Sequence, residues 1–309
     1  MSQPPLLDHA TQTMANGSKS FATAAKLFDP ATRRSALMLY TWCRHCDDVI
    51  DDQTHGFASE AAAEEEANQR LARLRTLTLA AFEGAEMQDP AFAAFQEVAL
   101  THGITPRMAI DHLDGFAMDV AQTRYVTFED TLRYCYHVSG VVGLMMARVM
   151  GVRDERVLDR ACDLGLAFQL TNIARDIIDD AAIDRCYLPA EWLQDAGLTP
   201  ENYAARENRA ALARVAERLI DAAEPYYISS QAGLHDLPPR CAWAIATARS
   251  VYREIGIKVK AAGGSAWDCR QHTSKGEKIA MLMAAPGQVI RAKTTRVTPR
   301  PAGLWQRPV

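Results

Sequence analysis

Two short acidic segments carry the side chains best suited to chemistry. In residues 169–180, read as a helix, Asn172, Asp176 and Asp180 recur every four residues and therefore lie on one face. Carboxylates at this spacing repel each other, so the pattern favours a cation between them. Hard divalent ions such as Mg²⁺ take carboxylate oxygens and share their other positions with water and phosphates. The segment therefore predicts a site for a metal-bound phosphate group.

The second acidic segment, residues 47–52, repeats this spacing. It offers two pairs at positions i and i+4: Asp47 with Asp51, and Asp48 with Asp52. The spacing favours Asp47 with Asp51 as metal ligands but leaves open whether Asp47 or Asp48 touches the metal directly. Asp48 and Asp52 sit about 100° further around the helix, a position that also suits support of the ligands. Tyr40 and Arg44 share the face of Asp47. Two facing acidic helices predict an enzyme that acts on a diphosphate.

The length, composition and net charge are those of an ordinary globular protein. The chain has 309 residues, is 48% hydrophobic and is long enough for a sizeable core. A net charge of −4 argues against nucleic-acid binding, which needs a basic surface. The first ten residues lack the features of a signal peptide, and the longest apolar run, 138–147, is too short to span a bilayer. We expect a soluble, cytoplasmic protein with no nucleic-acid partner.

The seven cysteines are scattered, as is typical of a reducing compartment. Cys43 and Cys46 form a C-x-x-C pattern that could serve a redox or zinc site. No second pair follows at ligand spacing. The favoured interpretation is a pair of packed cysteines beside the acidic segment.

Helical periodicity runs through the chain, and nothing alternates with period two for long enough to predict a strand. Helices are predicted near residues 30–52, 56–83, 89–102, 106–121, 154–180, 206–234 and 238–261, with a further helix through 134–143. Thr127 and Asp130 resemble a capping box. Ser18 and Ser20 could cap a short helix or meet a phosphate. The sequence predicts an all-α, single-domain protein.

Two glycines interrupt the helix predicted through residues 134–143. Gly140 and Gly143, next to Ser139, stand in an otherwise apolar stretch. A glycine in a helix interior costs up to about 1 kcal/mol. Either another helix or a bulky apolar ligand must therefore approach the backbone closely, and the sequence leaves both interpretations open.

Four segments, in this order, resemble the squalene and phytoene synthase family: residues 18–21, 43–52, 134–143 and 164–189. The last is the most specific, because it places Gln169, Asn172, Arg175, Asp176, either Asp179 or Asp180, Arg185, Tyr187 and Pro189 at the family's spacing. The resemblance covers about residues 15–285. It implies an isoprenoid-synthase-type helical bundle around a central cavity, with an N-terminal arm (1–16), a prenyl-diphosphate synthase domain (17–290) and a flexible basic tail (291–309).

The resemblance also implies roles for single residues. The positions that match the family's metal ligands are Asp47, Asp51, Asn172, Asp176 and Asp180. The positions that match residues holding or positioning diphosphate are Ser18, Ser20, Arg44, Arg175, Arg185, Tyr187 and Tyr252. The positions that match the wall of the prenyl cavity are Phe21, Tyr40, Tyr134, Gly140, Val142 and Gln169. The predicted catalytic set is Asp47, Asp51, Asp176 and Asp180, with Tyr40, Tyr134 and Tyr252 turned toward a carbocation.

The family joins two prenyl diphosphates head to head, and bacterial phytoene synthases are the members most similar in length. The resemblance therefore implies condensation of two geranylgeranyl diphosphates to phytoene through a cyclopropyl diphosphate, the first committed step of carotenoid biosynthesis. The expected cofactor is Mg²⁺ or Mn²⁺, without NADPH.

Other functions on similar folds stay open at this point. A squalene or dehydrosqualene synthase would use farnesyl diphosphate. A prenyl-elongating synthase or terpene cyclase would lack the 134–143 and 185–189 segments. A non-catalytic helical assembly factor would be expected to lose its aspartates.

The C-terminal residues are basic and contain no acidic residue after Glu277. Such a tail could lie on an anionic membrane surface or remain solvated without a partner. A lipophilic substrate favours peripheral contact with the inner face of the membrane, and contact with downstream carotenoid enzymes is a further expectation.

Overall fold

The computed structural model describes residues 10–11, 24–51 and 60–308, without the side chains of residues 51 and 60–64. This part of the chain is helical and contains no strand, which confirms the all-α prediction. The helices are α3 Pro30–Asp51, α4 Glu60–Phe82, α5 Pro90–His102, α6 Pro106–Val120, α7 Phe128–Cys135, α8 Val141–Val149, α9 Glu155–Ala181, α10 Ala190–Asp195, α11 Arg209–Gly233, α12 Pro239–Ala262 and α13 Lys275–Thr294.

Local sequence signals set several helix starts. At α3, the Asp29 carboxylate accepts hydrogen bonds from the N–H groups of Ala31 and Thr32, and Pro30 occupies the first turn, where no N–H partner is needed. The predicted capping box at Thr127 and Asp130 is present at the start of α7. These contacts satisfy N–H groups that a helix leaves free at its N-terminus.

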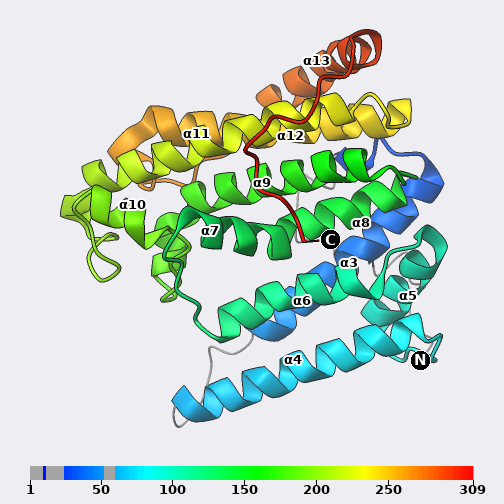
Figure 1. Cartoon of the computed structure of the whole chain (residues 1–309), viewed down its shortest axis with the longest axis horizontal. Helices are drawn as coiled ribbons and strands as arrows, with labels where there is room; N and C mark the ends of the chain where they lie inside the picture. Colours follow the sequence, from blue (N-terminus) through cyan, green and yellow to red (C-terminus); the bar gives the residue numbers. More distant parts are fainter. Residues whose placement is uncertain (1–9, 12–23, 52–59, 309) are drawn as a thin grey trace.

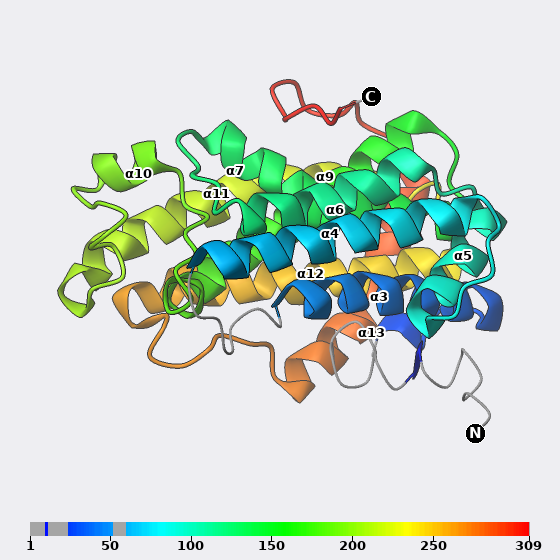
Figure 2. The same cartoon turned by 90° about the horizontal axis from the view of Figure 1, so that it is seen from below.

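Helix α9 runs through the middle of the bundle (Figure 1). Helices α11 and α12 pack on one side of it, and α7 and α8 pack on another. Its buried residues are distributed around the helix rather than along one stripe, as is typical of a helix enclosed by its neighbours. Helices α4 and α5 lie toward the outside, beyond α3 and α6 (Figures 1 and 2). The acidic segment of residues 169–180 is therefore carried by the central helix.

Close packing explains the glycines predicted to admit a neighbour. A short π-helix, Tyr136–Gly140, joins α7 to α8. A Cβ at Gly143 would lie 2.5 Å from the carbonyl oxygen of Ala161, and a Cβ at Gly165 would lie 2.5 Å from that of Ser139. Both distances are too short for any side chain. The close approach of a second helix, α9, therefore accounts for the glycines at this crossing.

Helix α3 is fixed by its apolar face. The fully buried ring of Trp42 stacks on Phe95 of α5, with 4.1 Å between ring centroids. On other faces of α3, Tyr40 and Cys43 line the cavity described below. Packing of Trp42 thus orients the acidic end of α3.

The chain after residue 290 differs from the predicted flexible tail. Residues 291–294 complete α13, and residues 295–308 then run across the bundle to end near α8 (Figure 1). Figure 2 shows this segment, called the C-terminal strap below, on the far side of α9 from α3. Arg300 and Arg307 pair with carboxylates of α9. The basic side chains that suggested a free tail are the ones that anchor it.

Among the described residues, no helix combines the length and the apolar composition that a transmembrane span requires.

Candidate active site

A cavity of about 240 Å³ lies between α3, α8, α9, α11 and α12. Its lining is mostly apolar and includes Leu39, Val142, Met146, Leu164, Phe168 and Val251. Of the predicted cavity wall, Tyr40 and Val142 line it, as do Ser139, Gly143 and Tyr252. Tyr134, Gly140 and Gln169 do not, and Phe21 lies outside the described residues, together with Ser18 and Ser20.

Gly140 has a packing role instead of a lining role. A Cβ on Gly140 would lie 3.0 Å from the sulfur of Cys162 and 3.3 Å from the ring of Tyr136. The position admits nothing larger than glycine without movement of these side chains. Gly140 therefore shapes the cavity indirectly, through the contact between the π-helix and α9.

At the acidic end of α3, the predicted phosphate-binding arginine is paired with carboxylates. Arg44 donates to Asp47 at 2.8 Å and to Asp48 at 2.5 Å. Asp47 and Asp48 remain 40% and 53% exposed, so they can be reached from solvent. Asp51 is the last residue of α3, and its side chain is not described. The pairing keeps Arg44 beside the carboxylates until an anion competes for it.

Two arginines hold Asp176 on α9. Arg175 donates from Nε to Asp176 Oδ1 at 2.8 Å and from Nη2 to Oδ2. Arg270, in the segment between α12 and α13, donates to Asp176 Oδ2 at 2.9 Å. Sequence reasoning missed Arg270, because it belongs to no motif and lies 94 residues from its partner. Both guanidinium groups are of the kind that binds phosphate oxygens, and they lie beside the predicted metal ligand Asp176.

Asp180 carries the clearest electrostatic signal of the site. The pKa of Asp180 is raised to about 7, first by burial and then by the negative charge of Asp176, while Arg185 opposes the change. A carboxylate that is costly to ionise where it stands gains most from a nearby cation. The predicted role of Asp180 as a metal ligand stays a prediction, and this environment fits it.

Asn172 has an unused oxygen on the same face. Its Nδ2 donates to Gln169 Oε1 at 3.3 Å, whereas its own buried Oδ1 has no hydrogen-bond partner. Buried polar atoms without partners are rare, and a bound ion is one explanation for them. Asn172, Asp176 and Asp180 therefore form a row of oxygen donors that suits a hard divalent cation.

The row does not by itself surround an ion. Among the described side chains, no three His, Cys, Asp or Glu residues lie close enough to form a complete metal site. Mg²⁺ commonly takes only one or two carboxylates and completes its shell with water and phosphate oxygens. The donors present thus fit an ion that is shared with a diphosphate.

Two tyrosines share an acceptor near Asp180. The rings of Tyr134 and Tyr187 stack with 4.4 Å between centroids, and both hydroxyls donate to Asp119 of α6, at 3.3 and 2.9 Å. Burial raises the pKa of both tyrosines, and Asp119 raises it further. Asp119 also raises the pKa of Asp180. Sequence reasoning missed Asp119, which carries no motif within its helix.

Tyr40 and Tyr252 lie where the cavity meets the charged residues. Burial raises the pKa of each hydroxyl, while Arg44 lowers that of Tyr40 and Arg175 lowers that of Tyr252. Tyr252 also stacks on Phe168, at 4.2 Å. The site therefore joins a charged end, suited to diphosphate, to an apolar cavity, suited to hydrocarbon.

The C-x-x-C pair contributes packing. All seven cysteines are free, Cys46 is fully buried, and burial raises the pKa of Cys43 to about 12. A thiol with so high a pKa is a poor nucleophile and a poor metal ligand. The prediction of packed cysteines is confirmed.

Comparison with known proteins identifies the family. A family model described as squalene/phytoene synthase matches residues 14–277. The chain belongs to the squalene/phytoene synthase family. It is 98% identical to a phytoene synthase of Pseudescherichia vulneris and 63% identical to a 15-cis-phytoene synthase of Pantoea ananas, each over 309 residues and the full length of both chains. The family predicted from the four segments is confirmed.

The fold agrees with this assignment. A crystal structure of a dehydrosqualene synthase in complex with a ligand superposes with a TM-score of 0.81 at 26% identity, covering 93% of this chain and 97% of that one. The predicted isoprenoid-synthase-type bundle is thereby confirmed. The squalene/phytoene synthase family uses prenyl diphosphates, which matches the charged end and apolar cavity of the site.

Proposed function

We infer that this protein is a prenyltransferase that joins two geranylgeranyl diphosphates head to head and releases phytoene, the first committed step of carotenoid biosynthesis. The observation that carries this conclusion is the 98% identity to a phytoene synthase over the whole of both chains. Two contacts support this reading: Asp47 and Asp176 are each paired with an arginine, and they act electrostatically on Tyr40 and Tyr252, which line the apolar cavity.

The reaction divides between the two ends of the site. The apolar cavity excludes water from the prenyl chains, so that a carbocation is not quenched prematurely. Arg44 and Arg175 hold carboxylates now and would exchange them for diphosphate oxygens when substrate binds. Tyr40 and Tyr252, at the junction, can present ring faces to the cation formed there. The second half of the reaction would then consume a cyclopropyl diphosphate in the same cavity.

We propose that Asp47, Asp51, Asn172, Asp176 and Asp180 hold a divalent metal ion, either Mg²⁺ or Mn²⁺. When bound, such ions neutralise the diphosphate and stabilise it as it departs. Three features support the proposal: the raised pKa of Asp180, the unpartnered oxygen of Asn172, and the two arginines on Asp176.

Arg185 and Tyr187 are proposed to position diphosphate from the segment that follows α9. The Tyr187 hydroxyl donates a hydrogen bond to Asp119 at 2.9 Å, and the positive charge of Arg185 lowers the pKa of Asp180. Ser18 and Ser20 keep the same proposed role, and Phe21 keeps its proposed place in the wall of the prenyl cavity, on the strength of their motif alone.

A second candidate function is condensation of farnesyl diphosphate, as in a squalene or dehydrosqualene synthase. The structural match to a dehydrosqualene synthase is the observation that supports this second candidate. Purified protein with Mg²⁺ should be given the twenty-carbon or the fifteen-carbon diphosphate, with and without NADPH. Phytoene formed without NADPH, and absent in Asp176→Ala, supports the proposal. A thirty-carbon product alone would favour the second candidate, and no hydrocarbon from folded protein would overturn both.

We further propose that the protein lies peripherally on the inner face of the membrane, through α13. Ile279, Met283 and Ile290 are 61%, 71% and 64% exposed and fall on one helical face. No acidic residue follows Glu277, and Lys278 of the same helix lines the cavity. An exposed apolar stripe among basic residues is typical of a helix that binds anionic lipid.

Sedimentation with anionic vesicles tests the membrane proposal. Met283→Glu should weaken binding, because it places a negative charge on the apolar stripe. Ile228→Glu, at another exposed apolar position that lies outside α13, is the matched control. Equal binding by wild type and both variants would contradict the role of α13. Contact with the enzymes that consume phytoene stays a prediction.

A further inference from the structure

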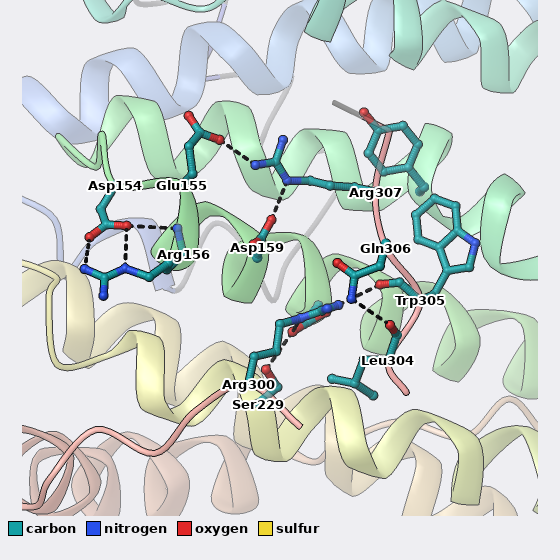
Figure 3. Close-up of polar contacts among 12 residues, drawn as sticks. Asp154, Glu155, Arg156, Asp159, Ser229, Arg300, Leu304, Trp305, Gln306 and Arg307 are labelled. Carbon is teal, nitrogen blue, oxygen red and sulfur yellow. Dashed lines mark hydrogen bonds and ion pairs between the residues drawn. The ribbon is translucent and has the colours of Figure 1, made fainter. Parts of the chain in front are cut away.

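The first turns of α9 have the cavity on one face and the C-terminal strap on the other. Arg160 and Ala161 line the cavity. Asp159 accepts a hydrogen bond from Arg307 of the strap at 2.7 Å (Figure 3). Asp159 and Ala161 are two positions apart, so their side chains point about 200° apart around the helix. Any displacement of these turns by the strap therefore moves the cavity wall.

The strap is attached to α9 through a buried ion pair. The carboxylate of Asp163 is fully buried and accepts hydrogen bonds from Nε and Nη2 of Arg300, at 2.9 and 2.7 Å. Ser229 of α11 donates to the same carboxylate at 2.6 Å. Arg300 also donates to the carbonyl of Trp305, which folds the strap on itself (Figure 3). One buried cluster thus ties the strap to both α9 and α11.

The strap also reaches the π-helix. The Trp305 ring lies 5.5 Å from that of Tyr136, between ring centroids, and the backbone N–H of Trp305 donates to the hydroxyl of Tyr226 on α11 at 3.2 Å. The segment therefore spans three elements, α9, α11 and the π-helix, behind the part of the cavity wall that Arg160 and Ala161 form. Its contacts are specific and largely buried, unlike those of a solvated tail.

Arg160 connects the strap to the cavity directly. It is only 7% exposed, and its guanidinium is turned onto two carbonyl oxygens: Ser229 at 2.9 Å and Thr298 of the strap at 2.5 Å. Its aliphatic stem is left to line the cavity. Arg160 precedes Asp176 by sixteen residues, about 24 Å along the helix axis, so it stands far from the charged end.

We propose that the C-terminal strap sets the length of prenyl chain that the cavity accepts, by holding the guanidinium of Arg160 out of its far end. The strap residues are positioning residues and do not touch the reacting atoms. The inference rests on the proposed function, since it presumes a prenyl substrate whose hydrocarbon end reaches this region. It adds a determinant that none of the four sequence segments contains.

The direction of the effect follows from what Arg160 would do without the strap. Loss of the Thr298 carbonyl leaves the guanidinium with one hydrogen-bond partner, the Ser229 carbonyl, and frees it to turn toward the cavity that Arg160 lines. A polar group there shortens the apolar space. A twenty-carbon chain would lose more contact than a fifteen-carbon chain, because only the longer chain needs the last part of the cavity.

Binding of unreactive substrate analogues tests the proposal without relying on turnover. Thiolodiphosphate analogues of the twenty-carbon and fifteen-carbon substrates should be titrated calorimetrically into wild type and Arg300→Gln. The ratio of the two Kd values should shift about tenfold against the longer analogue in the variant. Arg296→Gln is the control, because Arg296 is an exposed basic residue of the same strap and should keep the wild-type ratio.

Rescue identifies the residue responsible. Adding Arg160→Met to Arg300→Gln removes the guanidinium and should restore binding of the longer analogue; failure to restore it would overturn the role of Arg160. If Arg300→Gln does not fold, Arg307→Gln loosens the strap at an anchor whose carboxylate partners, Glu155 and Asp159, are more exposed than Asp163, and it should shift the ratio in the same direction. An unchanged ratio in a folded strap variant would overturn the inference alone. Failure of wild type to bind either analogue would overturn the proposed function with it.

Discussion

The proton on Asp180 gives the sharpest physical prediction for the metal-free protein. Its pKa is raised from 3.8 to about 7 in the folded state, through burial and the charge of Asp176. Between these two values the folded protein holds a proton that the unfolded chain has released. Stability from this group is therefore fully present below about pH 4, is lost as the pH rises toward about 7, and changes no further above that.

The magnitude follows from the same two values. Each pH unit between 3.8 and about 7 lowers the free energy of unfolding by about 1.4 kcal/mol, at most about 4 kcal/mol in total. Partial exposure of Asp180 reduces this to about 2–4 kcal/mol. For a chain of 309 residues, 3 kcal/mol corresponds to about 5 °C in Tm. Asp180→Asn, which stays neutral, should therefore melt above wild type at pH 8 and close to it at pH 4.5.

The assay is thermal unfolding of chelator-treated protein between pH 4.5 and 8. The difference in Tm between Asp180→Asn and wild type should grow with pH, because other carboxylates contribute equally to both. Asp268→Asn, at an exposed position, is the control and should give a constant difference. Mg²⁺ at pH 8 should restore stability to wild type more than to the variant. Parallel curves for Asp180→Asn and wild type would refute the reasoning.

Three further predictions concern other parts of the site. Arg300→Ala leaves the buried charge of Asp163 unpaired and should cost about 3–5 kcal/mol, seen as a Tm lower by about 5–8 °C; an unchanged Tm would contradict the ion pair. Gly143→Ala places a Cβ 2.5 Å from a carbonyl oxygen of α9 and should cost about 1–3 kcal/mol in chemical unfolding, whereas Gly287→Ala, with open space around it, should cost nothing; equal effects would refute the close crossing. Asp119→Asn removes a charge that raises the pKa of Asp180, so in chelator-treated protein the pH range over which the Tm advantage of Asp180→Asn develops should move lower when Asp119→Asn is also present; an unmoved range would show that Asp119 does not act on Asp180.

Local patterns predicted most of the helical framework. The helix starts at Asp29–Pro30, Asp89–Pro90 and Thr127 rest on side chains that bond to N–H groups two or three residues away, so the sequence contains both partners. The row of Asn172, Asp176 and Asp180 is equally local, because helix geometry alone puts every fourth residue on one face. These predictions needed no knowledge of how the helices pack.

The sequence could not predict what packs against the glycines of residues 134–143. Periodicity showed that something must approach Gly143, yet helix and ligand remained equal alternatives. Only the crossing of α8 over α9 placed the carbonyl of Ala161 against it. In the same way, the motif suggested that Tyr134, Gly140 and Gln169 line the cavity, whereas packing turned other residues of their helices toward it.

By itself, the sequence determined the all-α class, the two acidic helices and the family, because each depends on residues close together in the chain or on a recognisable spacing. The tertiary structure alone decided the partners that complete the site and its supports. Arg270 meets Asp176 across 94 residues, Asp119 meets Tyr187 across 68, and Arg300 meets Asp163 across 137. Such pairs follow no periodicity, since helix packing, and not spacing, brings them within hydrogen-bonding distance. A basic C-terminal segment therefore looked free in the sequence and became an anchored strap once buried carboxylates of α9 were there to receive it.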